Sequence, residues 1–132
     1  MARQQLTIKT MNPSSCSSAG GADYNVTYSP SGWTQKGSDI DGEAAGDDSG
    51  RVVSINSAGT IVAIGAHKND PGGASNAGHV RVYEWDDTAD DWSQKGADID
   101  GDSANDRFGI SVSINEAGTI LAVGADSDDD GG

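Results

Sequence analysis

Three observations predict an all-β fold made of two tandem, four-stranded antiparallel repeat units of about 58–59 residues. A segment that begins at Trp33 returns at Trp92 with 22 identities in 34 positions and no gap. Apolar and polar residues alternate along several short stretches, which is the period of a β-strand. Gly accounts for 19 of the 132 residues and hydrophobic residues for 34%, a composition that indicates short strands joined by tight turns. No stretch shows a helical period.

The repeat divides the chain into three parts. Residues 33–66 match residues 92–125 at a spacing of 59, and weaker similarity extends both copies towards the N-terminus. Self-similarity at a fixed period is the signature of a repeat architecture. The predicted parts are an N-terminal extension with a remnant strand at 1–16, repeat unit 1 at 17–74 and repeat unit 2 at 75–132.

Each unit is predicted to contain four strands. The third is apolar on both faces, so we expect it to be buried on both sides, and the fourth alternates, as a half-exposed outer strand does. The turn before the third strand ends in a Gly that can take the positive φ of a hairpin turn. The predicted strands are Trp33 to Ile40, a second strand through Val53 and Ile55 or from Phe108 to Ile114, a third at Thr60 to Ala66 or Thr119 to Ala125, and a fourth at His79 to Trp85.

A repeated four-stranded unit of this length is typical of a β-propeller blade, and propellers close at about four to eight blades. Two blades alone leave apolar faces in water. Either the sequence is a fragment of a longer array of blades, or several copies assemble. We expect the chain to associate with copies of itself through strand and blade completion, into a ring or a head-to-tail filament. A strand near Tyr24, Val26 and Tyr28 is the predicted spare element that completes a neighbour's blade.

Charge and cysteine content exclude several classes of function. The formal net charge is −13, which argues against nucleic acid, because phosphate is bound by excess Lys and Arg. No segment is apolar enough for membrane insertion. Cys16 is the single cysteine, so an internal disulfide is impossible. Strong acidity suits a saline medium, and we expect an extracellular or cell-surface location, although no signal peptide is visible.

The second copy carries Phe108-Gly109 and, after the hairpin, Ala122-Val123-Gly124-Ala125. With these motifs the chain resembles the FG-GAP repeat family, the blades of integrin-α-like propellers, and in particular the acidic arrays of marine microbes. The resemblance covers most of 17–132. It implies a seven-bladed propeller, adhesion or ligand binding, and calcium in the hairpin loop.

The acidic loops after the Trp-containing segments suit a calcium ion better than that hairpin does. The turn at Glu116-Ala117-Gly118 offers one carboxylate, whereas Ca²⁺ takes six or more oxygen ligands. The acidic loops after each Trp-containing segment are richer in oxygen donors, although the same Asp side chains also cap turns. The candidate calcium ligands are Asp39, Asp41, Asp47, Asp98, Asp100 and Asp106. No motif in the sequence indicates that a cofactor is required.

Two functions follow from these patterns. The first is a non-enzymatic structural or adhesive repeat protein whose main partner is itself. The alternative is a lectin-like or protein-binding module, in which glycans or cell-surface proteins bind at the propeller loops and Trp85 stacks on a ligand. An enzyme is not expected, because no nucleophile elbow or catalytic triad order appears.

Overall fold

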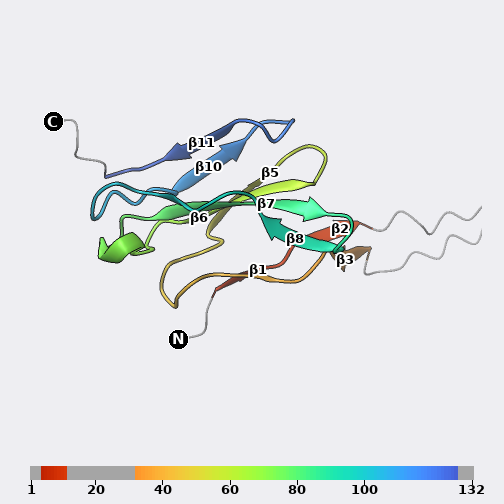
Figure 1. The fold of residues 1–132 in the computed structure, drawn as a ribbon, viewed down its shortest axis with the longest axis horizontal. Coiled ribbons are helices and arrows are strands. Elements are labelled where there is room, and N and C mark those ends of the chain that lie inside the picture. Colours follow the sequence, from red (N-terminus) through yellow and green to blue (C-terminus); the bar gives the residue numbers. More distant parts are fainter. Residues whose placement is uncertain (1–3, 12–31, 128–132) are drawn as a thin grey trace, which may run out of the picture.

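The computed structural model describes residues 4–11 and 32–127 and is all-β with antiparallel sheets (Figure 1). Its main feature, which we name the central sheet, has the strand order β5-β6-β7-β8, with β9 also pairing with β7. One short 3-10 helix, Pro71–Gly73, lies between β6 and β7. The strands of the central sheet are β5 (Val52–Ile55), β6 (Ile61–Ala66), β7 (His79–Asp86), β8 (Asp91–Gln94) and β9 (Ile99–Asp100).

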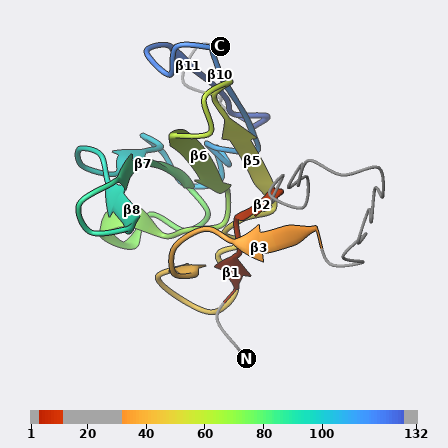
Figure 2. The ribbon, with the colours of Figure 1, turned by 90° about the vertical axis from the view of Figure 1, so that its right-hand side faces the viewer.

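Two smaller groups of strands flank the central sheet (Figures 1 and 2). The first, the N-terminal strand group, consists of the pairs β1-β4 and β2-β3. The second, the C-terminal hairpin, is the pair β10-β11. Their strands are β1 (Gln5–Leu6), β2 (Lys9–Met11), β3 (Trp33–Gln35), β4 (Ile40–Asp41), β10 (Ser111–Ile114) and β11 (Leu121–Gly124).

The registers show that each flanking group reproduces one half of the central sheet. In the central sheet Val80 of β7 pairs with Ile99 of β9, and in the N-terminal strand group Leu6 pairs with Ile40 in the same way. β2 likewise pairs with β3 as β7 pairs with β8. The C-terminal hairpin corresponds to β5-β6, since its registers are those of β5-β6 displaced by 59 residues. The N-terminal strand group is therefore an outer half-sheet and the C-terminal hairpin an inner half-sheet.

The central sheet runs from Val52 to Asp100 and so extends across the division between units 17–74 and 75–132. A repeat can be cut at any point without changing its period, so sequence alone does not fix where a sheet begins. Within the predicted extension 1–16, β1 and β2 take the place of β7, the predicted fourth strand. The predicted spare strand near Tyr24, Val26 and Tyr28 lies outside the described residues.

The core lies between the N-terminal strand group and the central sheet. Ile40, Val62 and Ile64 form its buried cluster, and Leu6 and Trp92 pack against it with Ile8 and Tyr83. All six residues of β6 are buried, which confirms the prediction for the third strand of the first copy. On the other side, a side chain at Gly65 would collide with the backbone of Gly109. Gly65 therefore permits the close approach of the segment that leads into the C-terminal hairpin.

Three predicted strands are corrected by the structure. The segment Trp33 to Ile40 is not one strand but two, β3 and β4, because Gly37 has φ +71 and interrupts the extended backbone. The second strand of the later copy begins at Ser111, not Phe108. The third strand of that copy, β11, is half-buried or exposed instead of buried, because no strand pairs with its outer edge in the described part of the chain.

The hairpin turns are confirmed. Gly59 has φ +66 and its N–H donates to Asn56 O, and Gly118 repeats this with φ +71 and a hydrogen bond to Asn115 O. Among the residues described, no helix is long and apolar enough to cross a membrane.

Candidate functional site

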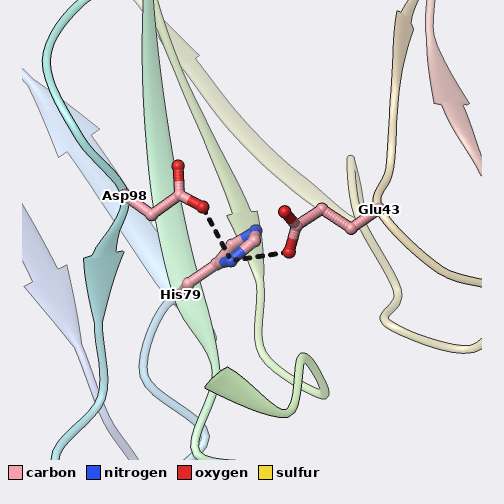
Figure 3. Close-up of side chains that lie close together, drawn as sticks. All are labelled: Glu43, His79 and Asp98. Atoms are coloured by element: carbon pink, nitrogen blue, oxygen red, sulfur yellow. Dashed lines mark ion pairs between the residues drawn. The ribbon is translucent and has the colours of Figure 1, made fainter. Parts of the chain in front are cut away.

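Three chemically active side chains meet where the N-terminal strand group contacts the central sheet (Figure 3). Glu43 follows β4, His79 is the first residue of β7, and Asp98 immediately precedes β9. One donor atom from each lies within 4.8 Å of the others. The β7-β9 pairing, in which His79 faces Asp100, fixes the distance between the histidine and Asp98, and the Glu43 loop approaches from the neighbouring strand group. We name these three residues the histidine–carboxylate cluster.

His79 has the least solvent contact in the cluster. Its side chain is 4% exposed, and Nδ1 lies 3.9 Å from Glu43 Oε2 and 3.9 Å from Asp98 Oδ2. These separations exceed a hydrogen bond, and Nδ1 has no hydrogen-bond partner. Burial lowers the pKa of His79, Arg81 lowers it further, and the two carboxylates oppose the change. The imidazole is therefore held neutral at pH 7, with an unused nitrogen directed between two carboxylates.

Arg81 and Asn69 fix the two carboxylates. The Arg81 guanidinium donates to both oxygens of Asp98, at 2.9 Å from Nε and 2.8 Å from Nη2, and Nη2 also bonds Glu43 Oε1. Asn69 Nδ2 donates to Glu43 Oε2 at 3.0 Å. The hydrogen bonds from Arg81 keep the pKa of Asp98 below its usual range, although burial opposes this. Both carboxylates are thus held in place beside His79.

The counterpart of Asp98 in the first copy is Asp39, and its surroundings differ. Asp39 accepts hydrogen bonds from the side chains of Gln5, Thr7 and Gln35. In the registers described above, Gln5 and Thr7 stand where His79 and Arg81 stand in the central sheet. Neutral partners therefore replace the histidine and the arginine at this place in the first copy.

The remaining predicted calcium ligands are divided between two loops and two short strands. Asp47 is buried and accepts from Ala44 N and Asn69 Nδ2, whereas Asp106 accepts from Ser103 N and leaves Oδ1 without a partner. Asp41 and Asp100 are exposed on β4 and β9. Within the residues described, no three of the six predicted aspartates share one ligand position, and Asp98 is grouped instead with Glu43 and His79.

Trp85, the predicted stacking residue, is half-buried on β7. Its ring meets Trp92 edge to face with centroids 5.3 Å apart, and Lys36 Nζ lies 4.4 Å from its centroid. Its Nε1 donates to Asp87 Oδ1. A shallow cavity of about 340 Å³ beside it is lined by Trp85, Thr88 and Lys95 among others. Trp85 thus has one ring face occupied by the lysine.

A second candidate site is formed by apolar side chains on the two open sides of the molecule. Ile40 and Ile99 occupy equivalent positions, yet Ile40 is 9% exposed and Ile99 is 40% exposed. The same contrast holds for every exposed large apolar side chain among the described residues. Trp33, Val53, Ile55, Ile99 and Ile120 are exposed, whereas their counterparts Trp92, Val112, Ile114, Ile40 and Ile61 are half-buried or buried.

The open sides also carry unpaired strand edges. In β11, Ile120 O and Gly124 O accept hydrogen bonds from the β10 side. Because successive residues of an antiparallel strand turn their backbone groups to opposite sides, Leu121 and Val123 direct theirs to the open edge. Ile8 O accepts from Lys36 N, so Thr7 and Lys9 direct their backbone groups away from β3 in the same way.

Comparisons with protein-family models, with curated proteins and with solved structures returned no match. The FG-GAP resemblance and the propeller therefore stay predictions from the sequence. The sequence placed Asp98 among the candidate ligands, but neither Glu43 nor His79 was among them. Glu43 and Asp98, the neighbours of His79, are distant in the chain, so no local spacing could have indicated them.

Proposed function

We propose that the protein is a non-enzymatic structural repeat protein whose copies join head to tail. The C-terminal hairpin of one copy is completed into a full sheet by the N-terminal strand group of the next. Both halves belong to the same type of sheet, one supplying the inner strands and the other the outer strands. An extracellular or surface location and an adhesive role are part of the same proposal.

The observation that carries the proposal is the contrast between equivalent apolar side chains. Ile99 is 40% exposed where Ile40 is 9% exposed, although both have the same chemistry and the same place in a sheet. Ile40 is buried with Val62 and Ile64 of β6, and Tyr83 of β7 and Trp92 of β8 pack against that cluster. The counterpart of β6 is β11, which is present, but nothing in the described residues takes the place of the outer strands β7 and β8 on the side of Ile99. A contact surface built from the same repeat would cover it, and a second copy of this chain supplies one.

The ladder between β6 and β7 gives the register of the proposed junction. In it Val62 pairs with Tyr83 and Ile64 pairs with Arg81. Transferred to the open edges, this register pairs Leu121 of one copy with Lys9 of the next, and Val123 with Thr7. Trp33 of the second copy then lies over Lys95 and Gly96 of the first, as Trp92 lies over Lys36 and Gly37 within one copy.

Each copy contributes one complete sheet and two halves, which amounts to two propeller blades. Such a heterologous contact closes into a ring if its rotation permits and otherwise continues as a filament. Three or four copies would give the six or eight blades of a closed propeller. The net charge of −13 opposes association, and salt screens this repulsion, so assembly is expected to strengthen between about 10 mM and 150 mM salt.

The proposal is tested by molar mass in solution, using proline to remove one outward backbone N–H from each edge. Val123→Pro alters the C-terminal edge and Lys9→Pro the N-terminal edge, and proline is tolerated on edge strands. We expect the wild-type chain to assemble with rising concentration in light scattering coupled to chromatography. Each variant alone is expected to be monomeric, and an equimolar mixture to give one-to-one dimers, since each retains the edge that the other lacks.

Far-ultraviolet circular dichroism checks that both variants stay folded. Thr88→Ser, a change at an exposed position in the turn between β7 and β8, is the control and should assemble as the wild type does. A wild-type chain that remains monomeric and stable at millimolar concentration contradicts the proposal. So does a mixture of the two proline variants that forms nothing larger than a monomer.

A further inference from the structure

The histidine–carboxylate cluster contains a buried donor that the protein itself leaves unused. His79 Nδ1 is without a hydrogen-bond partner, on a side chain that is 4% exposed. An unpaired buried polar atom lowers the stability of the fold, so the position of Nδ1 between two carboxylate oxygens indicates a ligand-binding site. Figure 3 shows the ring edge of His79 directed into the gap between Asp98 and Glu43.

We propose that Glu43 Oε2, His79 Nδ1 and Asp98 Oδ2 bind one divalent transition-metal cation of the Zn²⁺ class. One imidazole nitrogen and two carboxylate oxygens are a ligand set that zinc takes, with water in the remaining positions. Ca²⁺ prefers six to eight oxygen ligands, whereas imidazole favours Zn²⁺ and neighbouring first-row ions. The site is separate from the aspartate loops in which the sequence predicts calcium.

The distances require the ligands to move closer together. Nδ1 lies 3.9 Å from each of the two carboxylate oxygens, and the three donor atoms all lie within 4.8 Å of one another. Ligands of a tetrahedral zinc ion with bonds of about 2.0–2.2 Å are about 3.3–3.6 Å apart. His79 is held in the ladder of β7. The carboxylates are more exposed than the imidazole, so they are the groups that can move, by about half an ångström towards His79 and by up to about 1.5 Å towards each other.

Two further residues orient the ligands. Arg81 bonds Glu43 through Oε1, which leaves Oε2 directed towards His79, and Asn69 Nδ2 holds that same Oε2. Hydrogen bonds of this kind to ligating carboxylates are usual around protein metal sites. Two carboxylates against one guanidinium leave the cluster with one net negative charge, which favours a cation.

The first copy supplies an internal comparison. Asp39 has the position of Asp98, but Gln5 stands in place of His79, and Asp39 already accepts hydrogen bonds from Gln5 and Thr7. No imidazole is present there. We therefore expect one metal ion per chain, and because all three ligands come from one chain, the site forms whether or not copies assemble.

The consequence of binding is a cross-link between two parts of the fold. Glu43 belongs to the loop after β4, whereas His79 and Asp98 belong to the central sheet. A ligand that binds only the folded state raises the free energy of unfolding once its concentration exceeds Kd. Metal would thus fasten the N-terminal strand group to the central sheet.

Isothermal titration of the metal-free full chain with Zn²⁺ at pH 7.5 tests the proposal, with Co²⁺ absorption as a second readout and thermal unfolding as a third. We expect one site per chain, a Zn²⁺-dependent rise in Tm, and at least tenfold weaker binding for His79→Gln and for Glu43→Gln. Glu43 is exposed, so the second variant preserves the fold if the first does not. Asp39→Asn and His67→Gln are the controls and should bind as the wild type does.

Absence of Zn²⁺ binding by the wild-type chain overturns the proposal, as does unchanged binding by both His79→Gln and Glu43→Gln. Loss of binding by Asp39→Asn to the same degree as by Asp98→Asn also overturns it, because the first copy would then supply the ligands.

Discussion

Ile61 packs against Gly118, and Ile120, its counterpart 59 residues later, packs against nothing comparable in the described structure. A Cβ on Gly118 would lie 2.7 Å from Ile61 Cδ1, and Ile61 is 8% exposed while Ile120 is 67% exposed. The first contact joins the central sheet to the C-terminal hairpin. In the proposed assembly Ile120 makes the same contact with Gly59 of the next copy.

This relationship predicts different effects of alanine at the two turn glycines. Gly118 and Gly59 both have positive φ, +71 and +66, so alanine costs about 1–2 kcal/mol at either. Gly118→Ala also forces a methyl group against Ile61, whereas a Cβ on Gly59 meets nothing within 4 Å. We expect Gly118→Ala to lower the free energy of unfolding by about 2–4 kcal/mol and Gly59→Ala by about 1–2 kcal/mol, measured by urea denaturation of dilute protein.

The same two variants distinguish an effect on folding from an effect on assembly. Gly59→Ala should weaken association at high concentration although the single copy remains stable, because its methyl group faces Ile120 of the neighbour. Equal stability losses for the two variants, together with unchanged association of Gly59→Ala, would show that the neighbouring copy does not approach this turn.

Trp33 is expected to report assembly by fluorescence. It is 56% exposed, whereas Trp92 is half-buried and donates from Nε1 to Lys36 O at 2.8 Å. We expect acrylamide quenching to fall and emission to shift to shorter wavelength as protein concentration rises. Trp33→Phe should abolish the change, and a concentration-dependent shift that persists in this variant would place the interface elsewhere.

The two hairpin asparagines are expected to differ in importance. Asn56 Oδ1 accepts from Thr60 N and Ile61 N, each at 2.9 Å, and Asn115 does the same for Thr119 and Ile120. Asn56 is buried and Asn115 is less so. Asn56→Ala should cost about 1–3 kcal/mol, since buried N–H groups lose their acceptor.

Asn115→Ala is the matched control and should cost about 1 kcal/mol or less, because water reaches its exposed turn. Chemical denaturation of both variants at low protein concentration measures the difference. A larger loss of stability for Asn115→Ala than for Asn56→Ala would show that burial is not the cause of the difference.

Stability is expected to fall as pH drops from about 7 to 5, in part through His67. Burial lowers the pKa of His67, with Arg51, Lys68 and Arg107 acting in the same direction and Asp48 opposing them. The unfolded chain therefore binds more protons in this range than the folded chain, so stability is full above the unfolded pKa of about 6.5 and declines below it.

Denaturation with EDTA present, at pH 7.5, 6.5 and 5.5, measures this dependence. His67→Gln should flatten the decline without removing it, because the pKa of His79 is lowered as well. A decline of the same steepness in His67→Gln would exclude His67 as a source.

The local sequence pattern was sufficient to predict several strands. The apolar run after Gly59 predicted β6 and its burial on both faces, and the alternation from His79 predicted β7, because side-chain period and turn chemistry are encoded by adjacent residues. The first strand was predicted as continuous, since the sequence does not show that Gly37 takes a positive φ. The prediction that β11 is buried was wrong for another reason. Its burial depends on a neighbouring strand that is not adjacent to it in the chain.

The sequence by itself determined the repeat, the strand type and the hairpin turns, because identical residues at a fixed spacing impose the same local backbone preferences twice. Only the tertiary structure decided that the copies differ, that two half-sheets face outwards, and that Glu43, His79 and Asp98 meet. These properties depend on which strands lie beside one another, and contacts between residues far apart in a chain leave no local pattern to be read.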